Sequence, residues 1–253
     1  MIADLKCFLD EKYVQYNTLD FIESDPIQVP HRFSKKEDIE IAGLLTATIA
    51  WGQRKTIINN ALKMMELLDQ APHDFVLNHK PKDLHRFSGF VHRTFNPNDL
   101  AWFVSALQNI YKTHGSLENL FMPKADEENF KNGLERFRGL MLQTQHETRS
   151  QKHVSSPGKG SASKRLIMYL RWMIRQDNAG VDFGIWKDIS PALLSCPLDV
   201  HSGNVARKLG LLSRKQNDWK AVEELDVQLR KMDAKDPAKY DYALFGLGVF
   251  EGF

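Results

Sequence analysis

The sequence predicts an all-α protein, and three observations support this fold class. Apolar residues recur every three or four positions in most long segments of the 253-residue chain, which is the period of a helix with one buried face. No segment alternates apolar and polar residues for long enough to indicate a sheet. Proline and glycine separate the periodic segments. The length allows one large domain or two smaller ones, and no internal repeat is visible.

The first third of the chain predicts three helices. A helix over residues 2–17 is followed by two prolines, which remove backbone donors and stop a helix from continuing. A second helix is expected to begin at Ser34, with Ser34 and Glu37 forming a capping box, and to end before Gly52. A third helix restarts through residues 57–65, so the second and third form an α-hairpin.

The same period predicts helices in the rest of the chain. They are expected over residues 99–111, 130–141, 164–175, 200–209, 219–229 and 237–247. Two of them have clear N-caps, Asp199 and Asp218. In the helix that begins at residue 164, apolar residues form one buried face, and Arg165, Arg171 and Arg175 are offset from it.

Bulk charge does not indicate a class of partner, because the formal net charge is only +2. Any surface for nucleic acid must therefore be a local patch. No apolar run has the length of a membrane span, and the first residues lack the basic-then-apolar plan of a signal peptide. We therefore expect a cytoplasmic protein that does not enter a membrane.

The cysteine and histidine patterns argue against a metal centre. The two cysteines, Cys7 and Cys196, are too few for a disulfide framework or a four-thiolate iron–sulfur cluster. Four histidines, His73, His79, His85 and His92, recur at spacings that match no compact ligand pattern. We expect reduced cysteines, surface histidines, no metal and no cofactor.

Lys164 and Asp199 are the first candidate functional residues. Lys164 falls in the first turn of its helix, where the positive end of the helix dipole disfavours an ammonium group. In one interpretation Lys164 is a solvated cation and Asp199 is an ordinary N-cap. In the other, Lys164 is an amine nucleophile and Asp199 lies beside it. The residues themselves leave both interpretations open.

A polar turn between the second and third helices is a candidate contact with nucleic acid. The turn consists of Gln53, Arg54 and Lys55, and it is either a solvated loop or a surface that contacts DNA. Trp51, just before it, is either part of the core or a platform on which a base stacks.

A second candidate contact lies between Gln143 and Ser163, where apolar residues are almost absent. This segment is either disordered or a loop that holds a phosphate, as backbone amides at a helix N-terminus do. The groups that would hold the phosphate are the side chains of Lys152, His153 and Lys159 and the backbone amides of Gly158 and Gly160.

Three stretches of the chain resemble the helix-hairpin-helix (HhH-GPD) DNA glycosylase superfamily. The hairpin and lysine helix of that superfamily are similar to PGKGSASKRLIMYLRWM, and its essential aspartate segment is similar to PLDVHSGNVARKLGLL. Its upstream helix pair is similar to residues 38–68. The spacing from Lys164 to Asp199 is nearest to that of the archaeal type of 8-oxoguanine glycosylase. The whole chain also resembles an uncharacterised bacterial family of conserved hypothetical proteins.

The superfamily resemblance implies two adjoining helical lobes with a cleft between them. One lobe would be a bundle of residues 40–190, which includes the hairpin and Lys164. The other would comprise residues 1–39 and 191–253, which include Asp199. The two side chains would then meet in the cleft.

The activity that this resemblance implies is base excision by a DNA glycosylase, with or without AP-lyase activity, on damaged bases in duplex DNA. Lys164 would be the nucleophile, and Asp199 would either stabilise the developing sugar cation or assist proton transfer. Gln53 would enter the duplex near the extruded base. Two alternatives remain. One is a non-catalytic module that binds DNA or RNA on the same fold, and the other is a helical scaffold for protein partners.

Overall fold

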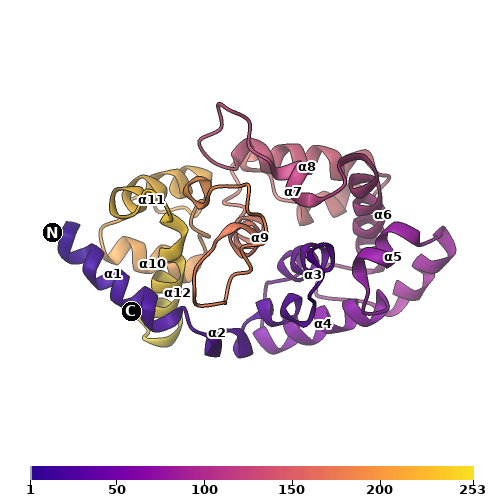
Figure 1. Cartoon of the computed structure of the whole chain (residues 1–253), viewed down its shortest axis with the longest axis horizontal. Coiled ribbons are helices and arrows are strands. Elements are labelled where there is room, and N and C mark those ends of the chain that lie inside the picture. Colours follow the sequence, from indigo (N-terminus) through magenta and orange to yellow (C-terminus); the bar gives the residue numbers. More distant parts are fainter. Residues whose placement is uncertain (1) are drawn as a thin grey trace. The chain divides into compact units, whose positions relative to one another are not determined.

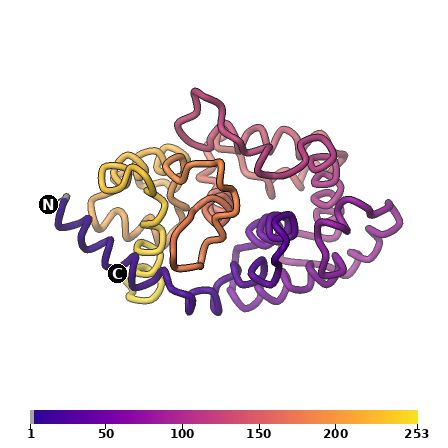
Figure 2. Tube along the Cα trace, viewed as in Figure 1, coloured from indigo at the N-terminus to yellow at the C-terminus, as the bar shows by residue number. Residues whose placement is uncertain are grey.

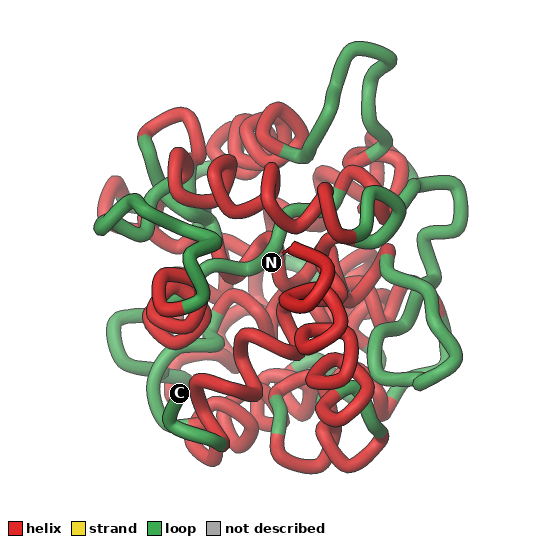
Figure 3. The backbone as a smooth tube through the Cα atoms, turned by 90° about the vertical axis from the view of Figure 1, so that its left-hand side faces the viewer, coloured by secondary structure: helices red, strands yellow, loops and turns green. Residues whose placement is uncertain are grey.

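A computed structural model describes residues 2–253, and these residues contain helices, turns and loops but no strand (Figures 1 and 3). The all-α prediction is therefore confirmed. The α-helices are α1 (Ile2–Tyr16), α2 (Leu19–Ser24), α3 (Lys36–Thr48), α4 (Arg54–Leu67), α5 (Pro72–Asn78), α6 (Pro97–His114), α7 (Leu117–Phe121), α8 (Lys131–Gln143), α9 (Lys164–Ile174), α10 (Val200–Lys208), α11 (Trp219–Met232) and α12 (Tyr240–Phe250). Short 3-10 helices at Pro26–Gln28, Pro30–Arg32, Pro81–Gly89, Thr148–His153, Pro157–Lys159, Pro191–Leu193 and Pro237–Lys239 lie between them.

The capping box predicted at Ser34 is wrong. Helix α3 begins two residues later, and its N-cap is Lys35, whose side chain makes no capping hydrogen bond. Glu37 is thus the second helical residue and cannot reach back to the backbone of Ser34. The predicted caps at Asp199 and Asp218 are confirmed, because both side chains accept backbone N–H bonds from the first turn of α10 and α11.

Of the two interpretations of the segment between Gln143 and Ser163, disorder is wrong. The segment forms two 3-10 helices, and its Ser150 and His153 side chains are buried. The order comes from a polar anchor, since the buried Asp99 carboxylate accepts hydrogen bonds from Ser150 Oγ at 2.5 Å and Arg149 at 2.9 Å. The composition of the segment shows only that apolar residues are few, and it does not show that Asp99 anchors the segment.

The chain divides into two compact units. Unit 1 comprises the chain up to Ile22 together with Pro123–Asn132 and Ser156–Phe253. Unit 2 comprises Glu23–Met122 and Gly133–Ser155. Of the bundle expected over residues 40–190, residues 123–132 and 156–190 therefore group with unit 1. Lys164 and Asp199 both belong to unit 1. The division into lobes implied by the resemblance stays a prediction.

Unit 1 is built around α12, which packs against α1 and α10. Figure 2 shows the indigo start of the chain beside its yellow end. The close approach of α1 needs a glycine, because a Cβ on Gly246 would lie 2.1 Å from the ring of Tyr16. On the other contact, a Cβ on Gly248 would lie 3.1 Å from Cβ of His201 in α10. The C-terminal helix is thus fixed against the helix that Asp199 caps.

Helix α9 is buried more completely than its amphipathic pattern predicts. Arg171 and Arg175, expected off the buried face, are 3% and 0% exposed. Arg171 pairs with Asp182 at 3.2 Å and with Asp241, and Arg175 pairs with Asp182 at 3.1 Å. Buried arginines need such partners, because an unpaired charge in the interior is very costly. Periodicity missed this network because it scores arginine as polar.

Asp226 in α11 gives a pH-dependent prediction. Burial raises the pKa of Asp226 to about 6, although Arg230 lies 3.4 Å away. A carboxyl whose folded pKa is raised contributes stability at low pH that is lost as pH rises toward 6. The Asp226→Asn variant has no carboxyl at this position, so it does not lose this stability as the pH rises. The free energy of unfolding of the variant minus that of the native protein should therefore increase by up to about 3 kcal/mol between pH 4 and pH 7. Urea unfolding at both pH values measures the change, and an unchanged difference would contradict it.

None of the described helices has the length and apolar character needed to cross a membrane.

Candidate functional site

A tight turn precedes the lysine helix. Ser156 Oγ accepts a hydrogen bond from Lys159 N at 3.1 Å, and Gly160, with φ of 87°, adopts the left-handed conformation that glycine tolerates. The Gly160 N–H donates to Pro157 O at 2.9 Å and so closes the turn. Gly158, Lys159 and Gly160 are exposed, as a surface for phosphate would require. In this conformation the Lys159 side chain is available to a phosphate, whereas the Gly160 amide is used within the turn.

The turn is paired with the segment that leads into α11. Trp219 N donates to Gly160 O at 3.1 Å, and Ser161 and Asp218 form an isolated antiparallel bridge. Ser163 then enters α9 with φ of 50°, a left-handed conformation that is uncommon outside glycine. Its side chain does not cap the helix. The N-terminus of α9 therefore has no cap of its own.

Lys164 is the first residue of α9, and the structure brings it beside Asp199. Lys164 Nζ lies 3.5 Å from Asp199 Oδ2, and the two side chains are 28% and 24% exposed. The proximity expected in the functional interpretation is thus present. The carboxylate that the start of α9 lacks in its own sequence comes from the start of α10.

Asp199 uses its two carboxylate oxygens differently. Oδ1 accepts hydrogen bonds from His201 N at 2.8 Å and Ser202 N at 3.0 Å, and Ser202 Oγ accepts one from Asp199 N at 2.9 Å. This is a complete capping box. Oδ2 faces Lys164. Asp199 is therefore both the N-cap of α10 and the partner of the lysine.

The electrostatics keep Asp199 ionised. Burial acts to raise its pKa, but the Lys164 ammonium and the bonds from Ser202 outweigh burial, and the pKa is lowered. Asp241, which also interacts electrostatically with Lys164, has the opposite behaviour, because burial raises its pKa to about 6. The site thus combines one lysine, one ionised carboxylate and one buried carboxyl that is easier to protonate.

The other predicted contacts lie in unit 2. Gln53 is the N-cap residue of α4 without a capping bond, and Gln53 and Lys55 are exposed, while Arg54 is partly buried. Trp51 is half-buried and stacks on His153 with ring centroids 5.9 Å apart. Lys164 and Asp199 both belong to unit 1, so their close approach does not involve Gln53, Arg54 or Lys55.

Two histidines depart from the expectations. His153 is 4% exposed, with Nε2 3.3 Å from Asp99 Oδ2, so it serves the core of unit 2 and is not available to a phosphate. Its neighbour Lys152 is exposed. His92 was expected at the surface, yet it is buried and bonded to Asn60 at 2.9 Å. Among residues 2–253, no three or more His, Cys, Asp or Glu side chains are grouped to hold a metal ion.

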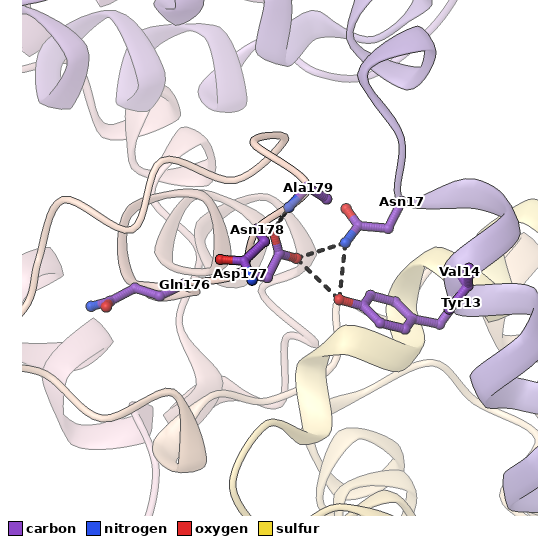
Figure 4. A pocket seen from close by; sticks show the side chains of 7 residues that line it. All are labelled: Tyr13, Val14, Asn17, Gln176, Asp177, Asn178 and Ala179. Carbon is purple, nitrogen blue, oxygen red and sulfur yellow. Dashed lines mark hydrogen bonds between the residues drawn. The ribbon is translucent and has the colours of Figure 1, made fainter.

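Sequence reasoning missed a pocket of about 580 Å³ in unit 1 (Figure 4). It is lined by Tyr13, Val14, Asn17, Gln176, Asp177, Asn178 and Ala179. Asp177 Oδ2 accepts hydrogen bonds from Tyr13 at 3.1 Å and Asn17 at 2.6 Å. Because α1 and the segment after α9 are far apart in sequence, no local pattern could have joined them. The lining includes neither Lys164 nor Asp199.

The fold and the site define an all-α protein with a lysine–aspartate pair at the N-termini of two helices. The chain belongs to the family described as "Protein of unknown function (DUF2400)", whose match covers residues 25–250. No curated protein and no solved structure matches the chain. This match agrees with the expectation from the sequence that the whole chain resembles an uncharacterised family.

Proposed function

We propose that this protein is a DNA glycosylase that excises a damaged base from duplex DNA with Lys164 as its nucleophile. The observation that carries the proposal is the 3.5 Å approach of Lys164 Nζ to Asp199 Oδ2. The two residues are 35 positions apart, and both side chains remain partly exposed. The hairpin-like turn before α9 and the capped start of α10 support the likeness to helix-hairpin-helix glycosylases.

The pair has the groups that such a reaction needs. The Lys164 ammonium first loses a proton to water, and the neutral amine attacks the sugar C1′ with its lone pair. The bond from C1′ to the base breaks, its electron pair leaves on the base, and the proton lost by the attached amine balances that charge. Ring opening then forms a C1′=N bond as the ring oxygen takes up a proton. The product is a Schiff base.

A carboxylate beside the lysine can either accept a proton or stabilise positive charge, and Asp199 suits the second role. A carboxylate with a lowered pKa is a weak proton acceptor, but it stays ionised and stabilises nearby positive charge. We therefore assign Asp199 to the developing sugar cation and to holding the amine in place. The exposed Lys159 is assigned to a backbone phosphate. Lys152, the α4 N-cap residue Gln53 and the first two residues of α4, Arg54 and Lys55, remain proposed DNA contacts of unit 2.

Borohydride trapping tests this proposal. The intact protein is incubated with a panel of duplexes that carry oxidised, alkylated or deaminated bases, and borohydride is added to reduce any Schiff base to a stable amine. We expect a covalent adduct with at least one duplex, and peptide mapping should place it on Lys164. Tight binding to DNA without an adduct from any lesion would support the non-catalytic module instead. No binding even at low salt would favour the protein scaffold.

The assignment of Lys159 predicts a change in salt dependence. Neutralising a phosphate releases counterions, so duplex affinity should fall steeply with salt concentration. Lys159→Ala should reduce the slope of log affinity against log salt concentration by about one. Lys82→Ala, which removes an exposed lysine of unit 2, is the matched control and should leave the slope unchanged. Equal slopes for the native protein and Lys159→Ala would contradict the assignment.

A further inference from the structure

The backbone of Asp199 is held by a residue from a distant loop. Asn217 Nδ2 donates to Asp199 O at 2.7 Å, and Arg207 donates to Asn217 Oδ1 at 2.6 Å. Arginine can only donate, and a carbonyl can only accept, so this site needs a side chain that does both. An asparagine amide meets that requirement in a single orientation.

The loop that carries Asn217 is fixed on both sides. Arg207 Nε donates to Arg214 O at 2.8 Å, and a terminal nitrogen of the same guanidinium donates to Lys215 O at 2.9 Å. Arg214 forms a two-point contact with Asp218, at 2.7 and 2.5 Å. One guanidinium therefore organises residues 214–217 and orients the amide that reaches Asp199.

Gly203 leaves the space that this contact needs. A Cβ at this position would lie 2.8 Å from Asn217 Oδ1 and 2.9 Å from an Arg207 guanidinium nitrogen. Gly203 is inside α10, where glycine costs about 1 kcal/mol relative to alanine. The close approach of Asn217 and Arg207 accounts for a residue that helix propensity disfavours.

The same loop is joined to the turn before Lys164. Asp218, the next residue after Asn217, bridges Ser161, and Trp219 N donates to Gly160 O at 3.1 Å. Two connections thus leave this loop, one to the backbone of Asp199 and one to the chain entering α9. The segment of residues 217–219 is thus hydrogen-bonded both to Asp199 and to the turn that leads to Lys164.

We propose that Asn217, oriented by Arg207, is a positioning residue that sets Asp199 Oδ2 toward Lys164. The effect of Asn217 on catalysis rests on the proposed function. The positioning of Asp199 by Asn217 is a property of the folded protein without DNA and can be tested separately. By holding Asp199 O, Asn217 fixes the start of α10 and therefore the direction in which the Asp199 side chain leaves the backbone.

Two substitutions separate positioning from simple structural support. Asn217→Asp preserves the volume and accepts from Arg207 with a stronger, charged contact, but it cannot donate to Asp199 O. Asn217→Ala removes both contacts. If Asn217 only supported the loop, Asn217→Asp would behave like the native protein. Asn204→Asp is the matched control, because Asn204 is an exposed asparagine of α10.

The first readout does not involve DNA. The rate at which acetic anhydride modifies Lys164 is followed by mass spectrometry, and Asp199→Asn calibrates the full loss of the ion pair. We expect both Asn217 variants to accelerate modification of Lys164 about two- to fivefold, toward the rate in Asp199→Asn, because a partly exposed ion pair is weakened. Native rates in both Asn217 variants, beside a faster rate in Asp199→Asn, would overturn the inference.

The second readout uses the trapped adduct. At saturating duplex, adduct formation should slow by about 10- to 100-fold in Asn217→Asp with unchanged DNA affinity, because misplacement of reacting groups by about 1 Å has effects of that size. Equal rates of adduct formation would overturn the catalytic part of the inference. If the native protein forms no adduct, the proposed function fails, and the modification rates still decide whether Asn217 positions Asp199.

Discussion

Lys164→Gln is expected to reduce the borohydride-trapped adduct by at least about 10³-fold, because glutamine has no nucleophilic amine. The fold should survive. Lys164 is 28% exposed in the first turn of α9, and substitutions at such positions usually change stability by about 0.5 kcal/mol or less. The melting temperature should therefore move by no more than about 2 °C. Adduct yield and thermal unfolding, measured on the same preparation, check both parts.

Lys159→Gln is the matched control for this result, because it removes a nearby lysine from the exposed turn and leaves the pair intact. It should form the adduct at saturating DNA. Asp199→Asn should bind DNA but release the base more slowly, and its loss of stability should not exceed about 1 kcal/mol, because asparagine is also a good N-cap. An adduct that persists in Lys164→Gln would assign the nucleophile to another amine.

Arg175→Met is expected to destabilise the protein by about 3–5 kcal/mol at pH 7, because breaking a buried ion pair leaves uncompensated charge in the interior. Arg175 is fully buried and lies 3.1 Å from Asp182, 2.9 Å from Asp236 and 2.6 Å from Asp177. Its removal leaves three carboxylates without their shared cation. The melting temperature should fall by about 6–20 °C.

This loss should shrink as the pH falls from 7 to 5. The Arg175 cation opposes the effect of burial on the pKa of Asp236, so without Arg175 this folded pKa lies further above its unfolded value and the variant regains stability as Asp236 protonates. Burial already raises the pKa of Asp236 in the native protein. Arg32→Met, at an exposed position, is the control and should change stability little at either pH. A loss that is equal at both pH values would contradict the electrostatic origin.

Local sequence signals predicted most of the helices and the N-cap at Asp199. The periods that predicted helices near residues 99–111, 130–141 and 219–229 correspond to α6, α8 and α11. The cap at Asp199 was predicted because an N-cap is a short-range pattern. The meeting of Lys164 and Asp199 was an implication of family resemblance, since a spacing of 35 residues carries no geometry of its own.

The features that local patterns missed depend on contacts between distant segments. Asn217 reads as an ordinary loop residue, and only the folded chain shows its bond to Asp199 O. Arg171 and Arg175 read as surface residues, because a polarity score contains no information about the aspartates that neutralise them. Composition left disorder open as one interpretation of the segment around Ser150 for the same reason, since the partner that anchors Ser150 is the distant Asp99.

The packing of α1 against α12 has a consequence for biosynthesis. Unit 2 ends at Ser155, so all of its residues have been synthesised about 90 residues before Gly246 is added. Unit 1 joins segments that lie far apart in the sequence, because Tyr16 of α1 lies against Gly246 of α12. Domains generally fold as units during synthesis, starting from the N-terminal one. The contact of Tyr16 with α12 therefore forms only after Gly246 has been synthesised, which is later than the synthesis of all of unit 2.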